Sequence, residues 1–231
     1  MIALSWRISV IIDSVPTLKE ISPLHEIVLI RHGEAAKSAT DPDPGLTALG
    51  QQQAQALVDD VGSRYPGGEG VRIISSPKSR TLQTALPLAT HWGHEILQAP
   101  DVIEIPSPEG MPLAQRGDWI RHLLHSEWDS LSASQAHWRE RLIAFLLSLD
   151  SHSGKMVSDS GGAFSDNAHT SLVFCHFMVI NSVVAQLRGD RKITQFYPDY
   201  TSQTHLKLDN GTLSLVELGR ALVPQGEHRI Q

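Results

Sequence analysis

An arginine and a histidine stand side by side in the segment Leu29-Ile30-Arg31-His32-Gly33. Phosphoryl transfer needs a nucleophile inside a cationic pocket, and this pair supplies both kinds of group. Neutral imidazole is available near its ordinary pKa of about 6.5, and one ring nitrogen can be fixed by a backbone carbonyl while the other faces phosphorus. The guanidinium stays charged and donates hydrogen bonds in pairs to phosphate oxygens. The pair therefore predicts a site for a phosphorylated ligand.

The pair follows a short apolar run, residues 26–30, which is typical of a strand buried on both faces of a parallel or mixed sheet. Ligands of open α/β sheets bind at the carboxyl ends of such strands. His32 is therefore placed for chemistry, and Gly33 lets the backbone come close to a bound anion. Taken alone, the short motif also fits a histidine that merely ends a strand, so the rest of the chain must decide.

Two further segments predict helices that begin beside this strand end. Thr47 is a good N-cap, and one buried face follows it at helical spacing: Ala54, Leu57, Val58 and Val61. Residues 71–89 indicate a strand, a turn and a helix with Arg80 in its first turn. A cation there opposes the helix dipole, which favours a bound anion that compensates both charges. The alternative is an exposed arginine on a solvated helix face.

A third segment, Ser171 to Cys175, is another apolar strand that ends in a histidine, His176. The helix expected after it stops at Gly189, as glycine commonly ends helices. The chain thus places Arg31, His32, Arg80 and His176 where one phosphate pocket would need them.

These motifs, in this order, resemble those of the histidine phosphatase superfamily, also called the phosphoglycerate mutase-like fold, over residues 25–220. The resemblance implies a three-layer α/β/α architecture with a mostly parallel central sheet and a helical lid insertion at about residues 105–150. It implies that His32 is the nucleophile and that Arg31, Arg80 and His176 hold the phosphoryl group. Residues 1–24 would be an N-terminal extension and 221–231 a C-terminal tail.

The resemblance also implies a carboxylic acid, from the loop after the third strand, that protonates the leaving group and then acts as base toward water. We assign Glu104 to this role, with Glu109 as its rival, and both have the alternative of solvated surface in a proline-rich loop. His176 is expected to be protonated beside the phosphate dianion.

Three departures from the family pattern bear on the site. Phe177 follows His176 where the family usually has glycine, which predicts a narrower pocket at that corner. Ser38 stands where many members have asparagine, and it keeps one hydrogen-bond donor of shorter reach. The loop from Gly33 to Leu46 lacks the tryptophan-containing segment of the glycolytic mutases, which argues against mutase activity and is more similar to small bacterial phosphohistidine phosphatases.

Composition bounds the other possibilities. The chain has 231 residues, 41% of them hydrophobic and 19% charged, as expected for one sizeable globular α/β domain. Its formal net charge of -6 does not favour nucleic acid or anionic membranes as partners. Cys175 is the single cysteine, which precludes an internal disulfide and indicates a buried structural thiol. A cytoplasmic location is favoured, and a secretory signal in the apolar first fifteen residues is the less favoured reading.

The remaining elements are less determined. Trp119 to Leu124 and Trp138 to Leu149 indicate two amphipathic helices, which we expect to form the lid. Trp119, Trp128, Arg116 and Arg121 would then shape the leaving-group side, with core packing as the alternative for at least one tryptophan. Ser151 to Ala168 indicates a mobile surface loop. An Asp209-Asn210-Gly211 turn predicts a final hairpin.

The twelve histidines raise the question of a metal. His91 with His94, and His122 with His125, have spacings that could chelate, but neither pair is accompanied by carboxylates or cysteines in a zinc pattern. No cofactor is therefore expected. We expect a metal-independent phosphatase acting on a small phosphorylated metabolite or a phosphoprotein, with a phosphate-binding regulatory protein of weak turnover as the alternative.

Overall fold

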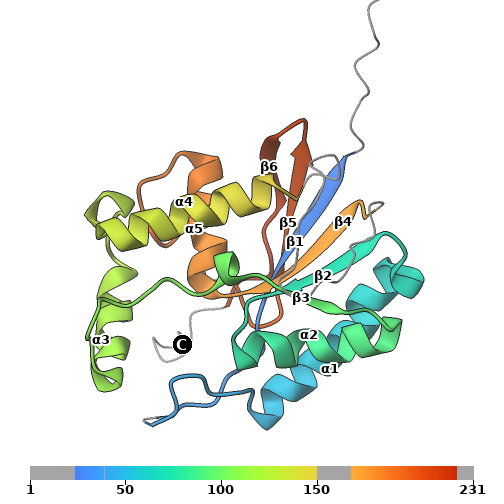
Figure 1. The fold of residues 1–231 in the computed structure, drawn as a ribbon, viewed down its shortest axis with the longest axis horizontal. Helices are drawn as coiled ribbons and strands as arrows, with labels where there is room; N and C mark the ends of the chain where they lie inside the picture. The colour runs from blue at the N-terminus through green and yellow to red at the C-terminus, as the bar shows by residue number, and fades with distance from the viewer. Residues whose placement is uncertain (1–23, 39, 150–167, 223–231) are drawn as a thin grey trace, which may run out of the picture.

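The computed structural model describes residues 24–38, 40–149 and 168–222. Six strands form one sheet in the order β3-β2-β4-β1-β5-β6, as Figure 1 shows. The strands are β1 His25–Arg31, β2 Val71–Ser75, β3 Ile96–Gln98, β4 Thr170–Cys175, β5 Gln203–Asp209 and β6 Thr212–Glu217. β1, β4, β2 and β3 are parallel to one another, whereas β5 runs antiparallel to β1 and β6 antiparallel to β5. This confirms the expected α/β fold with a mostly parallel central sheet.

The helices occupy both faces of this sheet. They are α1 Ala48–Arg64, α2 Ser79–Trp92, α3 Leu113–Leu123, α4 Ala133–Leu147 and α5 Phe177–Arg188, with short 3-10 turns at Pro66–Gly68, Pro100–Val102 and Trp128–Ser130. Alternate residues of β1 belong to different cores: Ile27 and Leu29 pack with α4 and α5, whereas Val28 and Ile30 pack with α1 and α2. The continuous apolar run was therefore correctly interpreted as a strand buried on both faces.

The expected helix caps are present. Thr47 is the N-cap of α1 and its hydroxyl accepts a hydrogen bond from Gly50 N at 3.0 Å. Gly189 ends α5 in the left-handed conformation with φ 63°. Asn210 and Gly211, with φ of 50° and 74°, form the turn of the β5–β6 hairpin. The sequence predicts these caps and this turn because each of them depends only on a few neighbouring residues.

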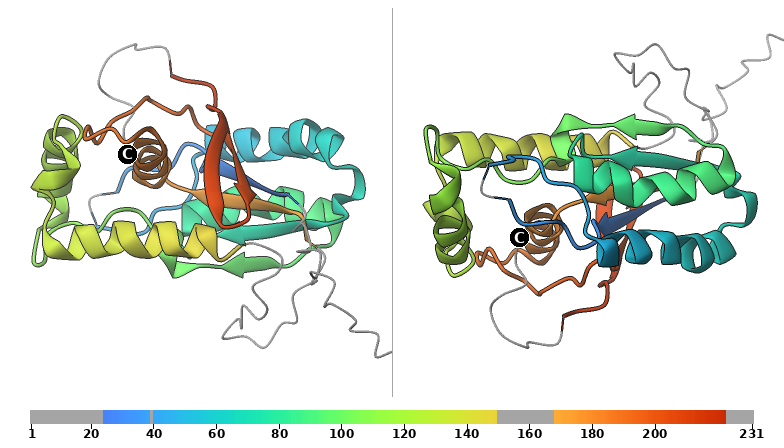
Figure 2. Two further views of the ribbon diagram at one scale, coloured as in Figure 1. Left: turned by 90° about the horizontal axis from the view of Figure 1, so that it is seen from above. Right: turned by 90° about the horizontal axis from the view of Figure 1, so that it is seen from below.

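The segment between Pro106 and Leu149 divides into two helices with different surroundings. α4 buries Trp138, Leu142 and Leu146 in the core and forms part of one covering layer, so it is no mobile lid. Of α3, only the last residue, Leu123, is buried. Figures 1 and 2 place α3 at one end of the molecule, beyond the sheet. Of the two helices expected to form a lid, α4 is part of the core layer, and the lid remains a prediction for α3 only.

Some expectations concern residues that the structure does not describe. The N-terminal extension, the loop Ser151 to Ala168 and the C-terminal tail fall, apart from their edges, outside the described residues. Among the helices that are described, none has the length and apolarity needed to cross a membrane.

Two glycines let α1 approach the segment that follows β1. A Cβ on Gly33 would lie 2.7 Å from the carbonyl oxygen of Gly50, and a Cβ on Gly50 would collide with the backbone of Glu34. The Thr47 hydroxyl donates a hydrogen bond to the Glu34 carboxylate at 2.9 Å, and the Glu34 backbone N–H donates to the Gln53 amide oxygen at 2.8 Å. The missing side chain of Gly33 thus makes room for α1, and its expected contact with a bound anion stays a prediction.

This contact yields a stability prediction. Gly50→Ala should lower the free energy of unfolding by about 1–3 kcal/mol, because the added methyl group overpacks a backbone contact. Gly62→Ala is the matched control in the same helix, since the nearest atom to its Cβ would be His91 Cδ2 at 3.9 Å. Ala at that position should be neutral or stabilise by roughly 0.5–1 kcal/mol. Urea denaturation of both variants measures the difference, and equal stability would contradict the packing argument.

Candidate active site

The carboxyl edge of the sheet gathers the polar residues that follow its central strands. Arg31 of β1 is paired with Cys175 of β4, so His32 and His176 emerge side by side. Their rings meet edge to face with centroids 5.3 Å apart. Ser76, directly after β2, joins them through its backbone N–H, which donates to Phe174 at 3.0 Å. Parallel register thus brings together residues more than a hundred positions apart.

His32 is buried, and its two ring nitrogens have different surroundings. Nδ1 lies 2.7 Å from the carbonyl oxygen of Gly33. A carbonyl only accepts, so Nδ1 carries the proton and Nε2 holds the lone pair. Nε2 is buried and has no hydrogen-bond partner among the described residues. Burial, followed by Arg80 and Arg31, lowers the pKa of His32 well below its ordinary value, so the ring is neutral at physiological pH.

Arg31 is fully buried and supported on several sides. Its Nη1 donates to the carbonyl oxygen of Pro198 at 2.7 Å. Its guanidinium lies 4.3 Å from the ring centre of Tyr200 and 5.4 Å from that of Phe177. Burial lowers the pKa of Arg31, and the charges of Tyr200 and Glu104 counteract it. The cation is thus held next to His32 by a carbonyl and two aromatic faces.

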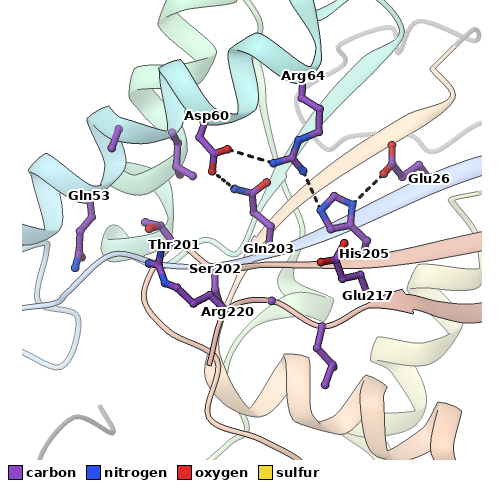
Figure 3. A pocket seen from close by; sticks show the side chains of 14 residues that line it. Glu26, Gln53, Asp60, Arg64, Thr201, Ser202, Gln203, His205, Glu217 and Arg220 are labelled. Atoms are coloured by element: carbon purple, nitrogen blue, oxygen red, sulfur yellow. Dashed lines mark hydrogen bonds and ion pairs between the residues drawn. The ribbon is translucent and has the colours of Figure 1, made fainter. Parts of the chain in front are cut away.

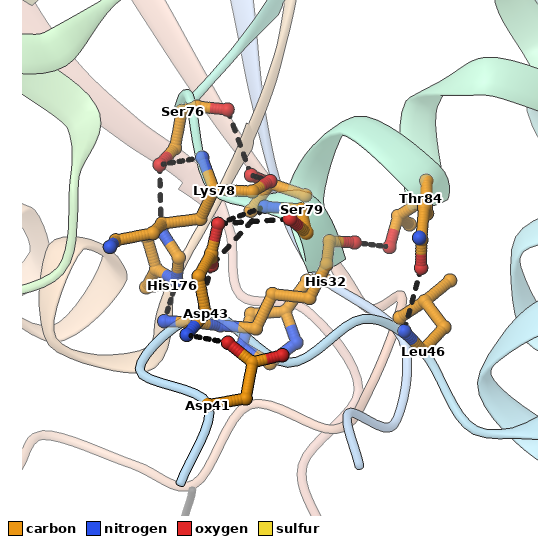
Figure 4. A network of polar contacts seen from close by, with 12 residues as sticks. His32, Asp41, Asp43, Leu46, Ser76, Lys78, Ser79, Thr84 and His176 are labelled. Atoms are coloured by element: carbon orange, nitrogen blue, oxygen red, sulfur yellow. Dashed lines mark hydrogen bonds and ion pairs between the residues drawn. The ribbon is translucent and has the colours of Figure 1, made fainter. Parts of the chain in front are cut away.

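Arg80, His176 and Ser76 form a hydrogen-bonded chain, of which Figure 4 labels His176 and Ser76. Arg80 Nη2 lies 3.2 Å from His176 Nδ1, and His176 Nε2 lies 2.9 Å from Ser76 Oγ. Because a guanidinium only donates, Nδ1 accepts and Nε2–H donates to the serine. Burial and the neighbouring cations, Arg80 first, lower the pKa of His176 well below its ordinary value. In the absence of phosphate His176 is therefore neutral, whereas the protonated form was expected beside a dianion.

Glu104 lies in the same electrostatic cluster, and Glu109 does not. The Glu104 carboxylate accepts hydrogen bonds from Ile105 N at 3.0 Å and from Met178 N, at the start of α5, at 3.2 Å. Burial raises the pKa of Glu104 although these N–H groups, Arg80 and Arg31 oppose the shift. Glu109 is exposed. Geometry thus favours Glu104 as the acid.

A family model for the histidine phosphatase superfamily (branch 1) matches residues 27–220. The chain belongs to this superfamily. The family match confirms the prediction made from the motifs, and it covers every strand and helix described above except the first two residues of β1.

Solved structures share this fold. Mycobacterial glucosyl-3-phosphoglycerate phosphatase aligns with a TM-score of 0.57 at 19% identity, over 80% of this chain and 90% of that one. Phosphoserine phosphatase from Entamoeba histolytica aligns with a TM-score of 0.59 at 22% identity, over 84% and 96%. A PE-PGRS family protein of Mycobacterium tuberculosis is 41% identical over 83 residues, which are 33% of this chain and only 13% of that protein.

Two residues at which this histidine phosphatase departs from the family pattern have clear positions. Phe177 is buried; its ring packs 5.7 Å from that of Tyr197 and lies against the Arg31 guanidinium. Its side chain therefore supports the cation from the core. Ser38 is exposed, and its hydroxyl accepts the backbone N–H groups of Thr40 and Asp41 at 3.2 and 2.7 Å. It stabilises a loop turn, and no contact of the described residues joins it to the histidine pair, so its phosphate-binding role finds no support.

Three residues of this site were missed in the sequence: Ser76, Asp43 and Tyr200. Ser76 follows an apolar strand just as His32 and His176 do, so the same rule could have found it. Asp43 lies 3.6 Å from Arg80 but sits in an aperiodic loop, and Tyr200 reaches Arg31 from the connection before β5. These two contacts depend on long-range folding, and no local pattern predicts them.

The residues proposed for the leaving-group side lie around α3. Arg116 and Arg121 are exposed, and Arg121 is ion-paired with Asp118. Trp119 packs partly against the core, whereas Trp128 is buried there under the Arg139 guanidinium, at 4.5 Å from its ring centre. The alternative of core packing is thus correct for Trp128.

Lys78 lies closer to the histidine pair than these residues do. No acidic side chain of the described residues pairs with it, and its charge helps to lower the pKa of His176.

No group of three or more His, Cys, Asp or Glu that could hold a metal ion occurs in the described part of the chain. Cys175 is buried in β4, where burial raises the pKa of its thiol, in agreement with a structural thiol.

A separate cavity of about 690 Å³ lies between α1 and the β5–β6 hairpin (Figure 3). Four of its titratable side chains, Glu26, Asp60, Arg64 and His205, form one network of hydrogen bonds and ion pairs. His205 contacts the Glu26 carboxylate at 3.0 Å and Arg64 at 2.9 Å, and Asp60 accepts from both Arg64 and Gln203. The cavity contains none of the residues of the His32 cluster.

Proposed function

We propose that the protein is a metal-independent phosphatase that hydrolyses a phosphomonoester through a covalent phosphohistidine on His32. The observation that carries this proposal is the free, buried Nε2 of a neutral His32 between Arg31, Arg80 and His176. A lone pair held among cations is suited to attack a phosphoryl group that would otherwise repel it.

The proposed reaction has two steps. His32 Nε2 forms a bond to phosphorus while the bond to the leaving oxygen breaks, and Glu104 gives that oxygen its proton. Water then attacks phosphorus, the Glu104 carboxylate takes the water proton, and the bond to Nε2 breaks to release inorganic phosphate. Arg31 and Arg80 neutralise the equatorial oxygens in both steps, and His176 joins them when the bound dianion favours its protonated form.

The two pKa shifts suit these roles. A lowered His32 pKa keeps the nucleophile neutral further into the acid range, and a raised Glu104 pKa keeps the acid protonated toward neutral pH. The two shifts therefore both widen the pH range in which neutral His32 and protonated Glu104 coexist. Turnover should fall below the pKa of His32 and above that of Glu104.

Two contacts argue against the alternative, a phosphate-binding regulatory protein of weak turnover. The Phe177 ring packs against the Arg31 guanidinium, and Glu104 lies in the electrostatic cluster of Arg80 and Arg31. We propose a small phosphorylated metabolite as the substrate, and a phosphoprotein is the alternative substrate. The proposed reaction is hydrolysis rather than mutase transfer. The solved phosphoserine and glucosyl-3-phosphoglycerate phosphatases support this class, as does Lys78, which is suited to a negative charge on the leaving group. The cytoplasm is the proposed location.

Hydrolysis of p-nitrophenyl phosphate in EDTA tests the function. The wild type should turn over in chelator, and His32→Ala should lose roughly a thousandfold or more of kcat because the covalent step is gone. Inorganic phosphate should still bind to the variant through the remaining cations, as measured by calorimetry. Activity that disappears in EDTA, or that persists in the variant, would refute the mechanism.

The acid is tested by comparing Glu104→Gln with Glu109→Gln. The first change should lower kcat for an alkyl phosphate by about 10²–10⁴ and abolish the alkaline limb of the pH profile, because the amide transfers no proton. p-Nitrophenyl phosphate, with its good leaving group, should lose less in the first step. The exposed Glu109 should tolerate the same change. If the losses were reversed between the two variants, Glu109 would be the acid.

A further inference from the structure

The first turn of α2 receives its cap from a distant loop. Its N-cap residue is Lys78, which makes no capping side-chain hydrogen bond. Asp43 supplies the missing acceptor: its carboxylate accepts Ser79 N at 3.1 Å and Ser79 Oγ at 2.9 Å. A carboxylate at this position also compensates the positive end of the helix dipole. The anion that the sequence requires near Arg80 is thus partly provided by the protein itself.

The same carboxylate reaches the Arg80 guanidinium. Asp43 Oδ1 lies 3.6 Å from Arg80 Nη1, while Nη2 of the same guanidinium donates to His176 at 3.2 Å. Arg80 is therefore held between an anion on one side and an imidazole on the other. A planar group held at both of its outer nitrogens keeps a defined orientation.

Asp43 is itself held in place. Its backbone N–H donates to Asp41 Oδ1 at 2.8 Å, and two residues before α1 the Leu46 N–H donates to Gln83 Oε1 of α2 at 2.7 Å. The loop is thus attached to α2 on both sides of Pro44. The carboxylate meets Arg80 from a loop that α2 itself fixes.

α5 shows the same arrangement on the other side of the site. Its N-cap, His176, also lacks a capping side-chain bond, and Glu104 accepts the Met178 N–H from outside the helix. Each of these two helices therefore begins beside the histidine pair with a carboxylate from a loop. Glu104 is buried enough to act as an acid, whereas Asp43 faces the arginine.

We propose that Asp43 is a positioning residue that fixes the Arg80 guanidinium in the orientation in which it meets the transferring phosphoryl group; this rests on the phosphatase function proposed above. Asp43 contacts Arg80 rather than the substrate. Its removal leaves the site more positive, so binding of a phosphate dianion does not weaken, whereas alignment in the transition state is lost.

Asp43→Asn separates these effects, because the amide oxygen still accepts the Ser79 N–H while the charge is gone. With p-nitrophenyl phosphate, kcat should fall roughly 10- to 100-fold. The inhibition constant of inorganic phosphate should stay at or below the wild-type value. Asp43→Glu, which keeps the charge, should recover part of kcat. Asp59→Asn, an exposed change of equal charge on α1, should leave both constants unchanged.

Two further measurements separate this proposal from a purely structural role of Asp43 and from a failure of the proposed phosphatase function. Ser79→Ala removes one capping bond but leaves the ion pair, so it should lower the melting temperature and keep kcat. The imidazole ¹⁵N spectrum of His176 reports the Arg80 contact without turnover, and it should change in Asp43→Asn. An unchanged kcat, an unchanged spectrum, or a kcat loss reproduced by Ser79→Ala would overturn the proposal. A wild type without turnover whose His176 spectrum still changes would refute the phosphatase function and leave the contact established.

Discussion

Positive groups crowd a buried space at the carboxyl edge of the sheet, and much of the surrounding structure compensates for this. Arg31 and both histidines are buried, and Arg80 lies beside them. Desolvation and mutual repulsion disfavour their charged forms, so both histidines are neutral and both arginine pKa values are lowered. A backbone carbonyl, two aromatic rings and two loop carboxylates stabilise the remaining positive charge. A phosphate dianion would relieve the same repulsion, which is why such a cluster binds it well.

The parallel register of the sheet brings these groups together. Three parallel strands end at one edge, and their register sets His32, Ser76 and His176 side by side. Two of the helices that follow, α2 and α5, start at this edge, and the first turn of α2 brings Arg80 to the site. Their N-cap residues, Lys78 and His176, make no capping hydrogen bond, and carboxylates from other loops accept the N–H groups of their first turns. The carboxylates that cap α2 and α5 therefore also belong to the candidate site.

Much of this was readable from local patterns. The apolar runs, Thr47, Gly189 and the Asn210-Gly211 turn each act over a few residues, and the motif order indicated that Arg31, His32, Arg80 and His176 converge. Other expectations depended on contacts between distant parts of the chain. Ser38 accepts hydrogen bonds within its own loop, Gly33 allows the close approach of α1, and α4 packs in the core. Asp43 and Tyr200 reach the arginines by contacts that only the folded chain creates.

The central claim is that phosphate is transferred to Nε2 of His32. Rapid quenching of the enzyme during turnover, followed by mass spectrometry at alkaline pH, measures it most directly, because phosphohistidine survives base and is lost in acid. We expect one acid-labile phosphoryl group on the peptide that contains His32, accumulating further in Glu104→Gln with p-nitrophenyl phosphate as donor. Turnover without any phosphorylated His32, or with the phosphoryl group on another residue, would contradict the account.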